Sequence, residues 1–327
     1  MTKYLFNIRM FDSVINVTTA NSSGNNLSAE IKDYYEKTLI KTTEAELVHD
    51  QFGQKKPIPA GNGKTIEFRR FTPLAKVTTA LVEGVTPDGQ ALDVSALTAT
   101  VKQYGGYVII SDMLDLTAYD SIKNEATELI GSQAGRSLDT VTREILNGGT
   151  NVQYHEGERA NRAALTATDK LTVKAIRAAV RTLKRQNARP INGDFVAIIH
   201  PDVAYDLMSD PEWVEWHKYT TPENMYRNEI GKIANVRFVE TTEAKIFEKA
   251  GASNMDVYST LVIANNAYGT TDIEGGGLQM IIQQKGSAGT ADPLDQRSTI
   301  GWKATKTAER LVEDYMVRIE TACSYTA

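Results

Sequence analysis

A run of alternating apolar and polar residues near the beginning of the chain restricts its fold more than any other feature. Residues 64–112 contain TIEFRRF, VTTALVEGVTPDGQALDV and LTATVKQYGGYVIISD, and such alternation is typical of strands. Between them, Val85-Thr86-Pro87-Asp88-Gly89 predicts a turn, because proline presets φ and glycine permits positive φ. We therefore expect a long β-arm of two or three strands, with a hinge at Gly105-Gly106.

An isolated β-ribbon is only marginally stable in water, so a chain that builds one is expected to lay it on a neighbouring molecule. This points to assembly rather than catalysis. Arg69 and Arg70 are candidate contact residues, because adjacent side chains point to opposite faces of a strand and one of them can bind across a subunit contact. Glu83, Gly84 and Asp88 are further candidates near the tip of the arm.

A long amphipathic helix is expected after the arm, from Tyr119 to Leu146. Its apolar stripe recurs at three- and four-residue steps and consists of Ile122, Ala126, Leu129, Ile130, Ala134, Leu138, Val141 and Ile145. Gly131 and Gly135 lie inside this helix, although a glycine costs about 1 kcal/mol there. They favour the close approach of another backbone, and the alternative is a kink or a break in the helix.

The rest of the chain mixes helical and strand patterns. Ser28 is expected to cap a helix that follows a polar, extended N-terminal segment. A second amphipathic helix is expected from Thr172 to Asn187, followed by a buried strand over residues 194–199 and several short strands over residues 236–282. Near the end, Trp302 and the final strand are expected to pack beside the long helix.

Composition restricts the class of protein. The chain has 327 residues and a net charge of −5, which excludes a globally basic nucleic-acid coat but not a local basic face. Such a face is expected on the second helix, where it can meet solvent, phosphate or an acidic neighbour. No apolar run approaches the roughly 20 residues that span a bilayer, so no membrane partner is expected. Cys323 is the only cysteine, which excludes an internal disulfide and predicts synthesis in a reducing cytosol.

Motifs that would carry catalysis are incomplete. Gly61-Asn62-Gly63-Lys64-Thr65 resembles the end of a phosphate-binding loop, but Ile58 stands where the pattern needs glycine, and a strand is expected to follow. His200-Pro201-Asp202 follows a buried strand and is expected to cap a short helix. The histidines lack metal-ligand spacing and are expected at the surface or in caps. They are His49, His155, His200 and His217. We expect no enzyme activity, no metal and no cofactor.

Nine strings along the chain resemble the major capsid proteins of tailed bacteriophages, which share the Johnson fold, and in particular their coliphage N-four branch. The strings are LSAEIKDYYEKTLI, LVHDQFGQK, KTIEFRRFTPL, LVEGVTPDG, VKQYGGYVIISD, LDTVTREILNGGT, AIIHPDVAYDL, AYGTTDIEG and DPLDQRSTIGWKA. They extend from about Leu27 to Glu320. Each string is weakly specific, and their number and order carry the resemblance.

The resemblance implies an α+β phage major capsid fold with four parts. Residues 1–56 would be an N-terminal arm, and residues 57–110 would be the extended β-hairpin called the E-loop. Residues 111–166 and 296–327 would form a peripheral domain around the long spine helix, and residues 167–295 would form an inserted axial α/β domain. Gly131, Gly135 and Trp302 join the arm residues as candidate assembly residues.

The resemblance also implies a structural protein of the virion capsid, made in the cytoplasm of a host bacterium. Its copies would self-assemble into pentamers and hexamers that close an icosahedral shell, with packaged double-stranded DNA on the inner face. A separate scaffolding protein and a portal protein are implied partners, and a decoration protein is a further option. The alternative is the shell protein of an encapsulin-like compartment that stores an enzyme.

Overall fold

The structure is a computed structural model, which describes residues 39, 43, 47–71, 74–81, 83–84, 86, 88–117, 122–217, 231–287 and 292–325. Several sequence predictions lie outside this part: the helix cap at Ser28, Val85 and Pro87 of the expected turn, and the start of the long helix at Tyr119.

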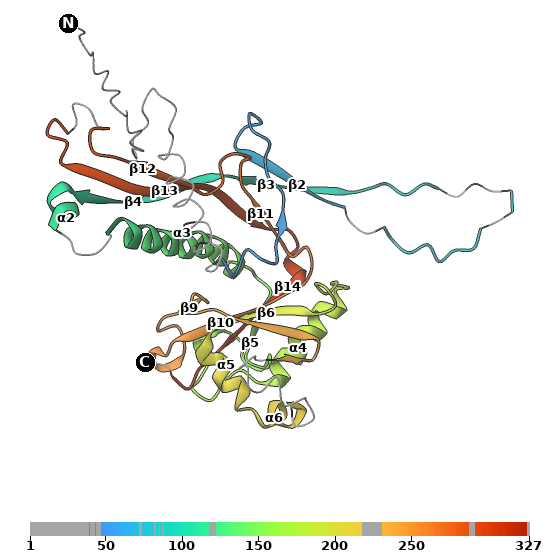
Figure 1. The fold of residues 1–327 in the computed structure, drawn as a ribbon. Coiled ribbons are helices and arrows are strands. Elements are labelled where there is room, and N and C mark those ends of the chain that lie inside the picture. Colours follow the sequence, from blue (N-terminus) through green and yellow to red (C-terminus); the bar gives the residue numbers. More distant parts are fainter. Residues whose placement is uncertain are drawn as a thin grey trace, which may run out of the picture.

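The described chain forms two β-sheets and a protruding ribbon (Figure 1). The five-stranded sheet consists of β1 (Gln54–Lys55), β11 (Tyr268–Thr271), β13 (Arg297–Arg310), β12 (Gln279–Gln283) and β4 (Lys102–Ser111). The seven-stranded sheet consists of β5 (Val152–Tyr154), β14 (Met316–Thr321), β10 (Val257–Ile263), β6 (Phe195–Ile199), β8 (Val236–Glu240), β7 (Lys232–Ile233) and β9 (Ile246–Phe247). The ribbon pairs β2 (Thr65–Phe71) with β3 (Val94–Thr100).

The long helix α3 (Ile122–Asn147) packs against the five-stranded sheet and confirms the predicted helix. Ala126, Ile130 and Ala134 of its apolar stripe are buried against the sheet. Leu129 is 71% exposed, so its assignment to the buried stripe was wrong. It lies next to Ile130 in sequence, and the resulting rotation of about 100° carries it past the edge of the buried face. The short helix α2 (Asp112–Thr117) precedes α3.

Helices cover one side of the second sheet. The predicted second helix is α4 (Val173–Arg185). Thr172 caps its N-terminus, because the Thr172 hydroxyl accepts a 3.2 Å hydrogen bond from the Ala175 N–H. β6 follows as a fully buried strand, and His200 caps α5 (Pro201–Met208) as predicted. α6 (Pro211–His217) completes this layer. Short 3₁₀ helices lie at Arg162–Ala164, Ala252–Asn254 and Glu313–Tyr315.

The final strand does not lie beside the long helix, contrary to the prediction. β14 pairs with β10 and β5 in the seven-stranded sheet, and all six of its residues are buried. A strand that is buried on both faces needs partners on both edges and a covering layer, which this sheet supplies. Val317 and Ile319 accordingly pack in the same core as helix α4.

The two glycines expected to form a hinge lie instead inside β4. Gly105 pairs with Lys303 and Gly106 pairs with Trp302, in a ladder that runs the length of β4. A Cβ atom on Gly105 would lie 2.7 Å from the Trp302 carbonyl oxygen, so the glycine permits a close approach of two strands rather than a bend. The third strand of the expected arm is therefore part of the body.

A buried polar cluster joins the segment before the arm to the long helix. The Asp139 carboxylate on α3 accepts a 2.7 Å hydrogen bond from the His49 backbone N–H and a 2.6 Å bond from the His49 ring. Lys306 pairs with Asp50 and donates to the Leu138 carbonyl. His49 is 1% exposed, so the prediction of a surface or cap position for it was wrong. Its buried polar groups are satisfied inside the protein, because Asp139 accepts from its backbone N–H and ring and the Tyr268 hydroxyl donates to the His49 carbonyl.

Candidate assembly surface

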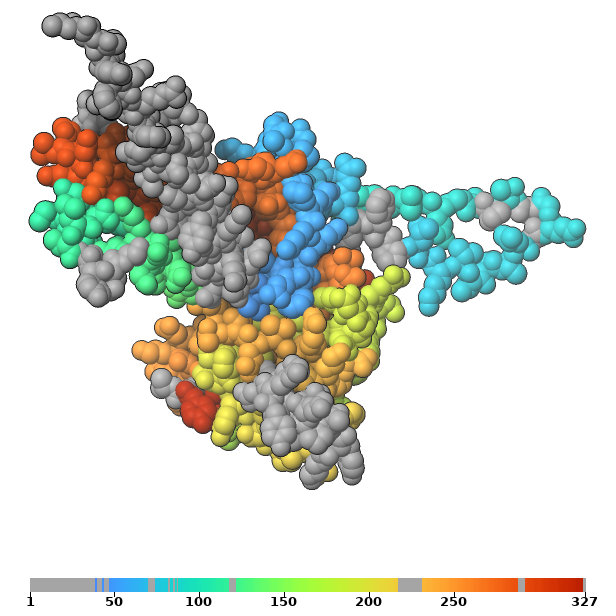
Figure 2. Space-filling view, in the orientation of Figure 1, coloured from blue at the N-terminus to red at the C-terminus, as the bar shows by residue number. Residues whose placement is uncertain are grey.

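The β-arm leaves the body and carries exposed apolar side chains. β2 and β3 pair in antiparallel register from Thr65 opposite Thr100 to Phe71 opposite Val94. Figures 1 and 2 show the ribbon and the described residues beyond it as a narrow extension from the body. The strands predicted between Val77 and Val94 are absent from the described residues there, which form turns, bends and irregular backbone. The exposed apolar side chains are Leu74, Val77, Leu81, Leu92, Val94 and Leu97.

The root of the arm is anchored by one aromatic side chain. Phe68 on β2 is 6% exposed, and a Cβ atom on Gly269 would lie 2.9 Å from its ring. Glycine at that position of β11 therefore leaves the space that the ring fills. The Lys56 ammonium lies over the Phe68 ring, 5.9 Å from its centroid. The sequence alternation predicted the strand but did not single out Phe68 as its anchor.

The candidate residues on the arm are separated from one another. Arg69 lies near the root and forms an exposed 3.1 Å ion pair with Glu67. Arg70 pairs with Ser95 across the ribbon, and its side chain lies outside the described part. Glu83, Gly84 and Asp88 are exposed in the loop beyond the strands. The structure does not bring these residues together into one site, so their role in assembly stays a prediction.

The other three candidates lie inside the subunit. Gly131 and Gly135 are buried in α3, and the Thr43 hydroxyl donates a 3.0 Å hydrogen bond to the Gly131 carbonyl. The Thr43 side chain therefore contacts the helix backbone at the first glycine, and the close approach of another backbone stays a prediction. Trp302 is 4% exposed, and its ring N–H donates to Gln133 on α3 at 3.3 Å. These positions are suited to internal packing, and direct contact with another subunit stays a prediction.

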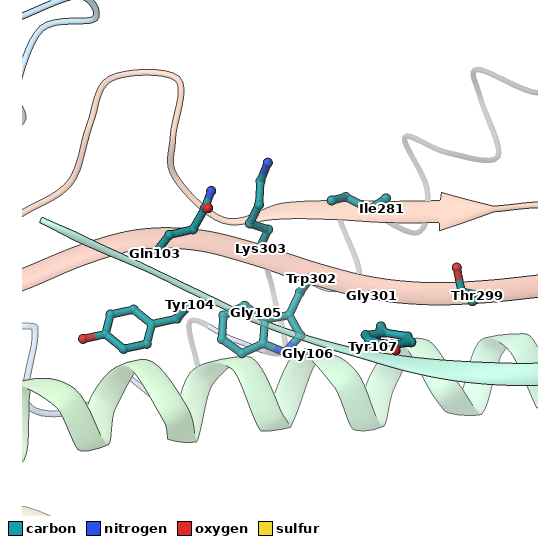
Figure 3. Close-up of a pocket in the computed structure, with 10 residues that line it drawn as sticks. All are labelled: Gln103, Tyr104, Gly105, Gly106, Tyr107, Ile281, Thr299, Gly301, Trp302 and Lys303. Atoms are coloured by element: carbon teal, nitrogen blue, oxygen red, sulfur yellow. The ribbon is translucent and has the colours of Figure 1, made fainter. Parts of the chain in front are cut away.

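The face of the five-stranded sheet opposite α3 contains a shallow hollow of about 420 Å³ (Figure 3). Its floor includes the exposed backbone of Gly105, and the buried Gly301 lies between Tyr107 and Ile281 in cross-strand register. Figure 3 shows Trp302 pointing toward the helix, whereas Lys303 points the opposite way. Tyr107 is 70% exposed. The sequence analysis did not predict this surface. Gly105 and Gly301, which lie on the same face of neighbouring strands, were the sequence features that could have indicated it.

The described part of the chain contains no group of three or more His, Cys, Asp or Glu side chains placed to hold a metal ion. The phosphate-loop-like segment leads directly into strand β2, so no helix N-terminus follows it. None of the described helices is both long enough and apolar enough to cross a membrane.

Comparisons with known proteins address the fold as a whole. A family model described as "Phage capsid protein" matches residues 94–315. The capsid of Ralstonia phage GP4 is 16% identical with a TM-score of 0.65, covering 84% of this chain and 87% of that chain. The capsid of cyanophage Pam1 is also 16% identical with a TM-score of 0.65, covering 85% of this chain and 91% of that chain.

A virus-like particle from Pyrococcus furiosus is similar at the level of the fold. It is 11% identical with a TM-score of 0.51, covering 89% of this chain and 99% of that chain. No curated protein matches the sequence. At these identities the solved structures show a shared fold and carry no individual residue role.

Proposed function

Because this chain belongs to the phage capsid protein family and is a capsid shell protein, we propose that its copies join into pentamers and hexamers. These capsomers would close an icosahedral shell around double-stranded DNA. The observation that carries the proposal is the β-arm, which leaves the body and exposes apolar side chains that the described part of its own chain does not cover.

The exposed side chains on the arm favour contact with another subunit. Leu81, Val77 and Leu92 are 74%, 72% and 68% exposed. Fully burying one side chain of this kind is worth about 1.5–3 kcal/mol, so a neighbour that covers all three gains several kcal/mol for each arm. The ordering of the arm opposes part of this gain. A contact of modest strength that is repeated around a ring is the kind that builds a closed assembly.

The sheet face opposite α3 is the proposed receiving surface for the arm of a second copy. Tyr107, Ile109 and Ile281 expose apolar surface there, at 70%, 51% and 40%. Gly105, two residues before Tyr107, is exposed, so a second backbone can approach the sheet closely at that position. The arm and this face thus supply two different surfaces of one subunit, as a heterologous ring contact requires.

The division of the subunit follows its two sheets. We propose that the five-stranded sheet and α3 form the peripheral part and that the seven-stranded sheet forms the axial part. This division crosses the expected boundaries, because β11 and β12 of the expected axial range would belong to the peripheral part, and β5 and β14 of the expected peripheral ranges to the axial part. The arm between β1 and β4 would be the E-loop.

The expected partners outside the shell itself are also proposals. A separate scaffolding protein would guide assembly, a portal protein would occupy one vertex, and a decoration protein is an option. Synthesis would take place in the cytoplasm of a host bacterium.

The test is to express the full chain and image it by negative-stain electron microscopy, alone and with the scaffolding candidate encoded beside it. A variant in which residues 85–92 are replaced by a Gly/Ser linker of equal length is expected to stay folded and to form no shells. The control is Val214→Ser, which removes an exposed apolar side chain from α6, away from the arm. Normal shells from the linker variant would contradict the role of the arm tip.

An encapsulin-like compartment is the second candidate, because the fold is shared with the virus-like particle from Pyrococcus furiosus. Purified native shells separate the two functions. Double-stranded DNA and a portal protein inside the particle support the phage head, whereas an encapsulated enzyme without DNA supports the compartment.

A further inference from the structure

A basic hollow lies on the seven-stranded half of the molecule, far along the chain from the arm. It has a volume of about 450 Å³ and is bounded by α4, by α6 and by the turn between β7 and β8. Val180 and Ile233 form an apolar floor, being 4% and 2% exposed. Arg181 and Lys184 on α4 and Trp216 on α6 line its rim.

The cations at this rim carry charge that the described part of the chain does not neutralise. Arg177, one turn before Arg181, forms a 2.6 Å ion pair with Glu212 on α6. No ion pair to a described residue is formed by Arg181 or Lys184. Basic residues in the last turn of a helix also stabilise its dipole, which accounts for Lys184. The helix dipole does not account for Arg181, which lies before the last turn. The local positive charge also contrasts with the chain as a whole, whose net charge is −5.

Trp216 exposes most of its side chain and contributes little buried area to the packing of helix α6. Helix α6 is already anchored by Trp213, which is 5% exposed and packs edge-on against Phe238 with 5.5 Å between ring centroids. Trp216 lies three residues later and is 59% exposed beside the hollow. A large exposed indole next to cations that form no ion pair with a described residue offers a flat stacking surface.

We propose that this hollow binds single-stranded nucleic acid. Arg181 and Lys184 would contact phosphates, and one base would stack on Trp216 above the apolar floor. Sequence-tolerant binding to single strands combines these two elements, a cationic track for the backbone and an aromatic platform for bases. An acidic peptide would use the same cations but gives no reason for the exposed indole. The binding is a property of the single subunit and does not depend on shell assembly.

The test uses the full-length unassembled protein and its intrinsic fluorescence. Trp213 and Trp302 are 5% and 4% exposed, so a change on addition of ligand reports on Trp216. Oligothymidylate is expected to quench the emission, with an affinity that falls about sevenfold between 50 and 200 mM salt for two phosphate contacts. Arg181→Glu with Lys184→Glu is expected to weaken binding at least about tenfold, because two phosphate contacts become repulsive.

The matched control is Lys64→Glu with Lys102→Glu, which reverses two exposed charges at the root of the arm. It is expected to bind like the unmodified protein. Trp216→Leu, followed by filter binding, is expected to weaken binding about tenfold through lost stacking. Unchanged circular dichroism establishes that each variant is folded.

Three results would overturn the proposal. One is equal loss of binding in the control variant. A second is duplex DNA of the same length binding as tightly as the single strand without quenching. The third is polyglutamate competing as well as oligothymidylate, which would assign the hollow to an acidic peptide.

Discussion

Replacing Asp139 tests whether the buried polar cluster holds the segment that leads into the arm. Asp139 is fully buried and accepts two hydrogen bonds from His49. Asp139→Ala leaves both donors without their acceptor, and each buried donor left unsatisfied costs about 1–3 kcal/mol. Asp139→Asn keeps one oxygen acceptor and is expected to cost about 1–3 kcal/mol, the penalty of one unsatisfied buried donor.

The assay is urea denaturation of the unassembled subunit, combined with hydrogen exchange over residues 47–56. Exchange in that segment is expected to rise most, because its backbone at His49 loses its acceptor. Asp115→Ala is the control, since Asp115 forms ion pairs with Lys123 and Lys285 near the surface and is expected to cost below about 1 kcal/mol. If Asp139→Ala costs no more than the control, the cluster does not anchor this segment.

Three further changes test other parts of the reasoning. Gly131→Val is expected to lower the melting temperature and particle yield well beyond Gly131→Ala, because Thr43 contacts the helix at this buried position; equal values would refute close approach. Phe68→Ala is expected to speed hydrogen exchange in β2 and β3 and reduce shell yield, while Leu97→Ala, its exposed cross-strand partner, has little effect; equal effects would exclude Phe68 as the anchor. Burial raises the pKa of Cys323 from 9.0 to about 11, so the folded state keeps a proton that the unfolded chain releases. Stability is therefore expected to fall as pH rises from about 9 to about 11, less steeply in Cys323→Ala, and identical alkaline slopes would contradict this.

Periodic elements could be predicted from the sequence because their pattern is local. The stripe of α4, with Val173, Ile176 and Leu183 inward, is buried as expected. β6 was recognisable as a short apolar run between a turn and a helix cap. The arm strand β2 was recognisable by alternation. In each case, neighbours within a few residues determine which face is apolar, and the fold then buries that face.

Pairing between distant segments was not accessible in the same way. β14 reads as a strand, but no local pattern states that it pairs with β10 rather than lying beside α3. The sequence of the two β4 glycines suggests a flexible point, and only their pairing with Trp302 and Lys303 shows that they lie inside a ladder. His49 reads as a surface residue until Asp139, ninety residues later, supplies its acceptor. These three missed features depend on partners that are remote in sequence.

The arm combines a fixed root with an unsupported end, and this contrast argues for an intersubunit role. Phe68 is held in a space left by Gly269, and the segment before the arm is tied to α3 through His49 and Asp139. Beyond the strands, Leu81 and Leu92 are mostly exposed. An arm that served only its own subunit would gain stability by folding these side chains onto the body. A fixed root gives the arm a defined direction. The exposed side chains at its end are buried only when a neighbouring subunit covers them, so their burial stabilises the contact between subunits rather than the single subunit.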